Sequence, residues 1–185
     1  MINFDLIREE LEKIITPKTV FACIGTKNAV FDSFGPLCGT LLESKGVPCY
    51  GTKSDMMNAA TMNYMMNIIY NIDKINNEDI IAIDACVAAR EHKLNKVDVR
   101  DAGVRPGAAV GHLFPTVGRN SIVMYTLTKT DLRDTISMYN KYGIGSYVGK
   151  RYDKCDQKLI REYANKITDI IAEIYHEVCV LSTIW

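Results

Sequence analysis

The chain lacks the common short motifs of nucleotide-binding proteins, serine hydrolases and zinc sites. Residues 25–36 form a glycine-containing loop, but neither G-x-x-x-x-G-K-[ST] nor G-x-G-x-x-G occurs, so a nucleotide site is poorly supported. No serine lies in G-x-S-x-G, which argues against a serine hydrolase. The six cysteines form no C-x-x-C pair, so the usual zinc-binding spacing is absent.

The chain also has no excess of either charge and no long apolar run. Lys and Arg together number 22, as do Asp and Glu, so the basic footprint of a nucleic-acid-binding protein is missing and no direct nucleic-acid partner is expected. No apolar run approaches the roughly 18 residues of a membrane span. The acidic, amphipathic start does not resemble a secretory signal. We therefore expect a soluble protein of the reducing cytoplasm.

Apolar spacing predicts alternating strands and helices along the chain. Strands are expected over 20–24, 48–50, 79–83, 97–99 and 121–126. Helices are expected up to about Pro17 and over 36–44, 55–71, 131–140 and 155–178. The methionines of the 55–71 helix are more typical of a core than of a ligand site. This alternation favours an α/β fold, a three-layer α/β/α sandwich with a mostly parallel sheet, as one domain over 1–185.

Two aspartates follow the most apolar predicted strands. Asp32 lies in the loop after strand 20–24, and Asp84 directly follows residues 80–83. In open α/β sheets, ligands and chemistry gather beyond the carboxyl ends of the strands. A carboxylate beside such apolar runs must face a crevice or a charged partner, because burial alone is costly. The two side chains are therefore candidates for an acid/base pair or a metal site.

Purely structural roles remain open for the same residues. Asp32 could cap the helix that begins near Ser33, and Asp84 could form a salt bridge with Arg90. Cys86 is a conceivable nucleophile, but its apolar flanks are more typical of an inert buried thiol.

A third segment, residues 101–112, contains three glycines and a proline. That composition suits a rigid, irregular loop where the backbone approaches a ligand, although a structural crossover loop has the same composition. His112, at its end, is a candidate metal ligand beside the two aspartates.

Three segments together resemble the germination protease of spore-forming bacteria. They are Phe-Asp-Ser-Phe-Gly-Pro at 31–36, Ile-Asp-Ala-Cys-Val-Ala-Ala-Arg at 83–90 and Asp-Ala-Gly-Val-Arg-Pro-Gly-Ala-Ala-Val-Gly at 101–111. Over most of 20–128 the chain resembles the shorter YyaC-type sporulation proteins still more closely.

This resemblance implies a fold of the phosphorylase/hydrolase-like type, which hydrogenase-maturation endopeptidases also use. By the same resemblance, catalysis falls on Asp32 and Asp84. In the hydrogenase-maturation relatives the corresponding acidic positions and a histidine bind a metal. That relationship would make Asp32, Asp84 and His112 a zinc or nickel site.

The leading hypothesis is a cofactor-independent endopeptidase in which Asp32 and Asp84 share a proton and activate water. Backbone N–H groups that could stabilise the oxyanion are expected at four positions: Ser33, Gly35, Gly107 and Gly111. The resemblance implies a protein or peptide substrate such as the small acid-soluble spore proteins, in the forespore or spore interior. It leaves a homo-oligomer open. The alternatives are a metal-dependent hydrolase with the same aspartates and a non-catalytic protein that holds a peptide or partner.

Overall fold

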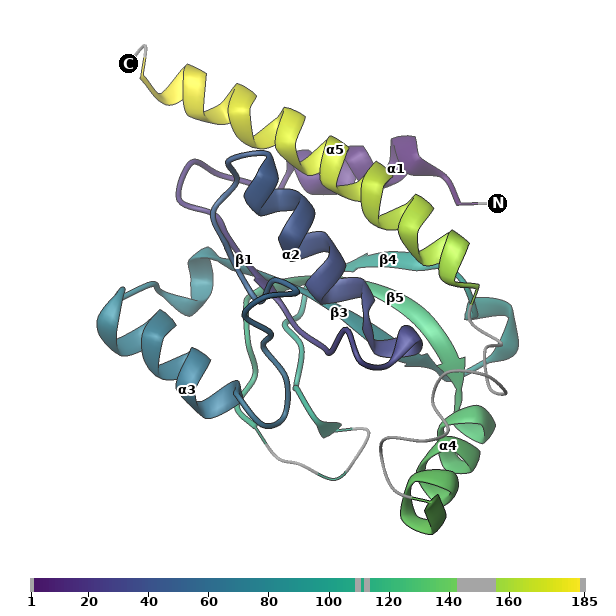
Figure 1. The fold of residues 1–185 in the computed structure, drawn as a ribbon. Coiled ribbons are helices and arrows are strands. Elements are labelled where there is room, and N and C mark those ends of the chain that lie inside the picture. The colour runs from purple at the N-terminus through teal and green to yellow at the C-terminus, as the bar shows by residue number, and fades with distance from the viewer. Residues whose placement is uncertain (1, 109–110, 112–113, 143–155, 184–185) are drawn as a thin grey trace.

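The computed structural model contains a five-stranded sheet with the strand order β2-β1-β3-β5-β4 (Figure 1). It describes residues 2–108, 111, 114–142 and 156–183. The strands are β1 (Val20–Cys23), β2 (Cys49–Tyr50), β3 (Ile80–Ala88), β4 (Val97–Arg100) and β5 (Asn120–Thr128). All neighbouring pairs are parallel except β4 with β5. The predicted α/β fold with a mostly parallel sheet is confirmed.

Helices cover both faces of this sheet. One face packs against α1 (Phe4–Glu12), α2 (Phe34–Ser44) and α5 (Gln157–Ser182). The other packs against α3 (Met62–Asn67) and the π-helical turn η2 (Ile68–Ile72). A further helix, α4 (Lys129–Tyr142), follows β5, and short 3-10 turns lie at Val30–Asp32, Asn77–Asp79 and Glu91–Lys93. Among the described helices, none combines the length and apolarity needed to cross a membrane.

The apolar runs found in the sequence form strands that are buried on both faces. In β3, Ile81 and Ile83 join the core beneath α1, α2 and α5. Ile80 and Ala82 point the other way and join the core beneath α3. This follows from the two-residue period of a strand, and it explains why a sheet covered on both sides needs continuous apolar runs. The predicted methionine core is present, since Met57, Met62 and Met65 are fully buried.

The order of the strands creates a crevice at one place in the sheet. From β1 the chain passes through α2 to β2 on one side, then returns through α3 to β3 on the other side. Such a reversal is a topological switch point, where connections leave the carboxyl ends of neighbouring strands in opposite directions. The crevice therefore lies beyond the carboxyl end of β1, beside the part of β3 that follows Ile83.

The predicted end of the second apolar strand is wrong. Asp84 lies inside β3, which continues to Ala88. The last register pair between β1 and β3 is Cys23 with Ile83, whereas β5 pairs with Asp84 through Val123 and continues beyond it. Asp84 is thus still paired with β5 on one side. On the other side it lies one residue beyond the last residue of β3 that pairs with β1.

The predicted long helix over 55–71 is also wrong, because α3 begins only at Met62. The preceding residues bond to their neighbours' side chains instead of forming helical turns. Thr52 Oγ1 accepts from the N–H of Asp55 at 3.1 Å, and Asn58 Oδ1 accepts from the N–H of Ala60 at 2.9 Å. Met57 lies against the end of β1, where its carbonyl accepts a hydrogen bond from the N–H of Gly25 at 3.0 Å.

Candidate active site

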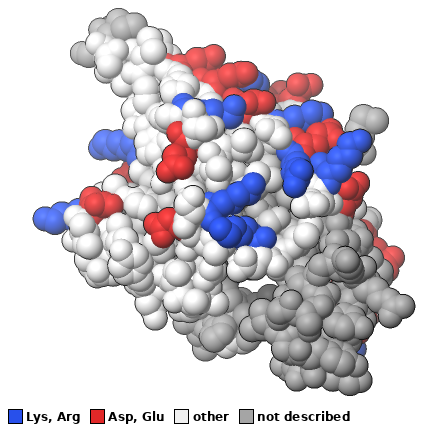
Figure 2. All heavy atoms as spheres, in the orientation of Figure 1, with Lys and Arg blue, Asp and Glu red and all other residues white. Residues whose placement is uncertain are grey.

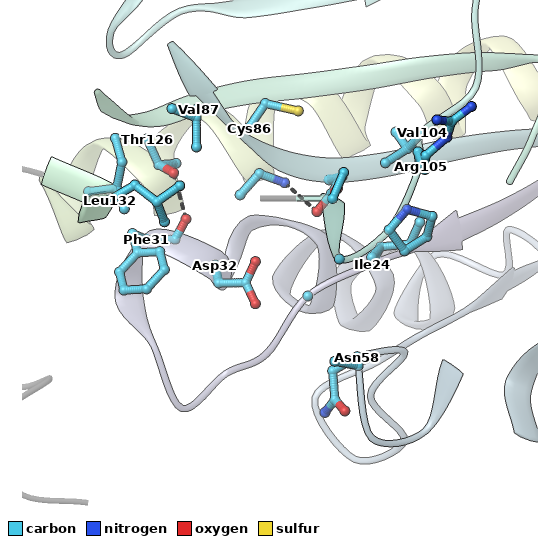
Figure 3. A pocket seen from close by; sticks show the side chains of 18 of the residues that line it. Ile24, Phe31, Asp32, Asn58, Cys86, Val87, Val104, Arg105, Thr126 and Leu132 are labelled. Carbon is cyan, nitrogen blue, oxygen red and sulfur yellow. Dashed lines mark hydrogen bonds between the residues drawn. The ribbon is translucent and has the colours of Figure 1, made fainter. Parts of the chain in front are cut away.

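A pocket of about 400 Å³ lies at the switch point, and both predicted aspartates line it. Asp32 comes from the loop after β1, and Asp84 comes from β3. Figure 3 shows the Asp32 carboxylate projecting from its turn into this space. Residues from the segment 103–108 also line the pocket, together with Met62 of α3 and Asn58, which precedes that helix.

Two hydrogen bonds to backbone carbonyls hold the turn that carries Asp32. The N–H of Thr26 donates to the backbone carbonyl of Asp32 at 2.9 Å. Thr126 donates from Oγ1 to the carbonyl of Phe31 at 2.6 Å and so ties the turn to β5 (Figure 3). Thr126 is the extra residue of a bulge, because Cys86 pairs with Tyr125 and Val87 with Leu127. The N-cap of α2 is Ser33, so Asp32 is not the helix cap considered from the sequence.

A glycine is required at position 25, where the turn that carries Asp32 packs against the residues that follow β1. Its φ is +133°, and a Cβ there would lie 2.2 Å from the backbone oxygen of Asp32. We expect Gly25→Ala to lower the free energy of unfolding by about 2–4 kcal/mol, since it combines backbone strain with a collision. Urea unfolding would measure the loss.

Gly46→Ala is the matched control for this prediction. Gly46 also has a positive φ, +70°, but a Cβ there would meet no atom within 4 Å. The strain alone should cost about 1 kcal/mol. Equal losses in the two variants would contradict a steric role for Gly25 at the Asp32 turn.

Asp84 is a buried carboxyl group, with 9% of its surface exposed. Burial and the nearby charge of Asp32 raise its pKa well above the ordinary value. The N–H of Ala85, which donates to Asp84 Oδ1 at 2.8 Å, and the charge of Arg100 oppose this rise. Arg90, the salt-bridge partner considered from the sequence, is exposed beyond the end of β3.

The pKa of Asp32 is raised less than that of Asp84. Burial raises its pKa from 3.8 to about 7, and a backbone hydrogen bond from Thr26 opposes the rise. Near neutral pH a large fraction of Asp32 is therefore ionised, while the raised pKa of Asp84 favours its protonated form. Two carboxyl groups whose environments separate their pKa values are suited to act as an acid and a base.

Arg100 is a pocket residue that the sequence did not reveal. Its Nη2 donates to the Tyr125 hydroxyl at 2.8 Å, and that hydroxyl donates to Asp98 Oδ2 at 2.9 Å. The guanidinium carbon lies 5.2 Å from the centre of the Tyr125 ring. Arg100 is thereby fixed beside the carboxyl pair. The sequence carried no signal for this position, because it depends on the antiparallel pairing of β4 with β5.

Cys86 also lines the pocket, but its thiol is poorly suited to attack a substrate. Burial and the charge of Asp84 raise its pKa to about 11, and Arg100 only partly opposes the rise. Because the thiolate is the nucleophilic form, the protonated thiol is chemically inert near neutral pH.

The four predicted oxyanion positions are spread over different places. Gly107 lines the pocket, and its φ is +72°. Ser33 donates its backbone N–H and its hydroxyl to Val30 and faces a second pocket. Gly35 packs against the backbone of Ile24, and Gly111 is exposed. Figure 3 shows the side chain of Arg105, another lining residue, directed away from Asp32.

The metal site predicted from Asp32, Asp84 and His112 stays a prediction. His112 lies outside the described residues. Among the residues that the structure describes, no three of His, Cys, Asp or Glu are grouped so that they could hold a metal ion. The described lining of the pocket includes two carboxyl groups, of Asp32 and Asp84, and two guanidinium groups, of Arg100 and Arg105.

The fold and the site together define an α/β protein with a buried carboxyl pair at a topological switch point. The chain belongs to the family described as "Protein of unknown function (DUF1256)", whose model matches residues 2–140. It is 34% identical over 116 residues to a Bacillus subtilis (strain 168) protein described as "Uncharacterized protein YyaC". The matching segment covers 61% of this chain and 55% of that relative, so the chain spans about half of the relative's length.

Proposed function

We propose that the protein is a peptidase in which Asp32 and Asp84 act as base and acid. The observation that carries this proposal is the pair itself. Two carboxyl groups line one pocket, and burial raises the pKa of Asp32 to about 7 and that of Asp84 well above its ordinary range. Such shifts are typical of functional sites. The resemblance of three segments to the germination protease supports the same assignment.

In the proposed reaction, ionised Asp32 accepts a proton from a water molecule as the water oxygen attacks the peptide carbonyl carbon. Protonated Asp84 donates a hydrogen bond to the carbonyl oxygen, where negative charge develops. One Asp84 oxygen is already occupied by the N–H of Ala85, which leaves the other to face the substrate. When the C–N bond breaks, a carboxyl proton passes to the leaving amine. One proton then remains on the pair, as at the start.

Arg100 would assist as a fixed positive charge. Its contacts with Tyr125 hold it at the pocket wall. A cation there favours the ionised form of the pair and the developing oxyanion. Because its side chain is already bonded, this stabilisation needs little rearrangement during the reaction.

The pocket's size and lining support a protein or peptide as the substrate. Both apolar and polar side chains line it: the apolar ones include Phe31, Met62, Val87, Val104 and Leu132, and the polar ones include Asn58, Arg100 and Thr126. Such a mixture suits one side chain and the adjoining amide groups of a peptide. Small acid-soluble spore proteins are the first substrates to test, since the resemblance links the chain to sporulation and to the spore interior.

The test is incubation of the purified protein with small acid-soluble spore proteins and a denatured reference protein, followed by mass spectrometry. We expect cleavage at defined peptide bonds, and none by the double variant Asp32→Asn/Asp84→Asn. Circular dichroism would establish that the variant is folded. Cleavage by the double variant at the wild-type rate would refute the assignment. Binding of the substrates without any turnover by the wild type would identify a non-catalytic binding protein instead.

A further inference from the structure

A second pocket of about 420 Å³ lies on the other side of the turn that carries Asp32. Val30 and Ser33 of this turn face the second pocket, whereas Phe31 and Asp32 face the first. The two pockets have no lining residue in common. The remaining lining comes from four regions, the loop after β1, α2, the loop after β2 and the start of α5: Lys27, Asn28, Leu37, Lys53, Gln157, Ile160 and Arg161.

The charged residues of this pocket all have the same sign. Lys27, Lys53 and Arg161 line it, and no Asp or Glu is among its described lining residues. The ion pairs formed within the described residues engage other cations, among them Lys45 with Asp169 and Lys166 with Glu162. Three like charges around one concavity repel each other, and a bound anion would relieve that repulsion.

Other groups around the pocket also favour an anion. Ser33 begins α2 without capping it through its side chain, so the positive end of an 11-residue helix lies beside the cations. Asn28 and Gln157 add side-chain amide donors. Three carboxylates lie one residue from lining residues of this pocket. Asp156 is the N-cap of α5 and accepts from the N–H of Lys158 at 2.8 Å, and Glu162 pairs with Lys166 at 3.1 Å. Asp32 lines the first pocket.

The floor of the pocket has a different character from its rim. Val30, Leu37 and Ile160 supply apolar surface, and Ile160 is only 1% exposed. Figure 2 shows a group of blue side chains near the centre of the face on which α2 lies in front of the sheet, within a mostly white surface. An apolar floor beneath a cationic rim matches a ligand with an apolar body and an anionic group.

We propose that this second pocket binds a small organic anion that carries a phosphate or carboxylate group on an apolar body. The cations and the start of α2 would hold the anionic group, and the floor would hold the body. The proposal concerns binding only, so it does not depend on the function of the first pocket.

Isothermal titration calorimetry with phenyl phosphate, phthalate and inorganic phosphate tests this proposal. We expect phenyl phosphate or phthalate, or both, to bind at one site with a Kd of about 1 mM, and inorganic phosphate to bind at least about threefold more weakly because it lacks an apolar body. The stronger of the two organic anions identifies the preferred anionic group. Lys53→Gln and Arg161→Gln should each weaken binding about fivefold.

Lys18→Gln is the matched control, because it removes the same charge from an exposed lysine at the opposite, amino end of β1. The affinity of this variant for the organic anions should stay within about twofold of wild type, since Lys18 lies farther from the second pocket than the Debye screening length. No saturable binding of either organic anion up to about 20 mM, well above the expected Kd, would overturn the proposal. Equal weakening by Lys18→Gln, or equal affinity for inorganic phosphate, would also overturn it.

Discussion

Asp32→Asn is expected to lower kcat/KM for peptide cleavage by about 10²–10⁴-fold, the usual contribution of a general base. Asparagine keeps the size and polarity of the side chain but cannot accept the proton of the attacking water. The wild-type enzyme should show kcat/KM rising with pH through about 7, because burial places the pKa of Asp32 there and only its ionised form is active. Activity should fall again where Asp84 loses its proton, at higher pH.

The measurement is kcat/KM between about pH 5 and 9, bracketing that pKa, for the wild type, Asp32→Asn and a control variant, Asp55→Asn. Asp55 is an exposed carboxylate in the loop after β2 and does not line the pocket. It should keep the wild-type profile. A profile that is flat from pH 5 to 9, or an Asp32→Asn enzyme with wild-type kcat/KM, would remove Asp32 from the reaction.

The same substitution is expected to make the folded protein more stable at alkaline pH. The pKa of Asp32 is raised from 3.8 to about 7 in the folded state. The folded state therefore keeps a proton that the unfolded chain has lost, and stability falls as pH rises from about 4 through about 7. At 1.36 kcal/mol per pKa unit, the loss from this group is at most about 4 kcal/mol above pH 8. Asp32→Asn removes that loss.

Urea unfolding at about pH 5 and pH 8 would test this, since the two values lie on either side of that pKa. Asp32→Asn should gain about 2–4 kcal/mol relative to wild type at the higher pH and much less at the lower pH. Asp84→Asn should change in the same direction, because burial and Asp32 raise the pKa of Asp84 as well. Asp55→Asn should follow the wild type. If the pH dependence of unfolding were the same in all four proteins, Asp32 would not have a raised pKa.

A gain in stability on substitution of the proposed base would be typical of functional sites, which hold groups in environments that the fold alone would avoid. Neither of the two structural alternatives considered from the sequence is present: the N-cap position of α2 is Ser33 rather than Asp32, and Arg90 is exposed beyond the end of β3. Within the described residues, neither aspartate thus has the structural role considered for it, and burial raises the pKa of both.

What the sequence predicted correctly depends on local patterns. The apolar runs at 20–24 and 79–83 form adjacent parallel strands, and the aspartates beyond them line one pocket. Where the prediction is wrong, contacts distant in sequence decide the structure. β3 continues past Asp84 because β5 supports it, and helix 55–71 is shortened because Met57 bonds to Gly25. Arg100 reaches the pocket only through the pairing of β4 with β5, which no local spacing encodes.

The early end of β1 has a consequence for how a peptide would be recognised. Beyond Ile83, β3 pairs with β5 on one side but no longer with β1 on the other. Among the described residues, the β1 side of residues 84–87 is therefore left as a strand edge at the pocket. A strand edge offers N–H and C=O groups to any extended main chain, whatever its side chains. A peptidase built in this way would bind its substrate mainly through main-chain hydrogen bonds and would recognise few of its side chains. Its selectivity would then depend on which proteins present an unfolded segment.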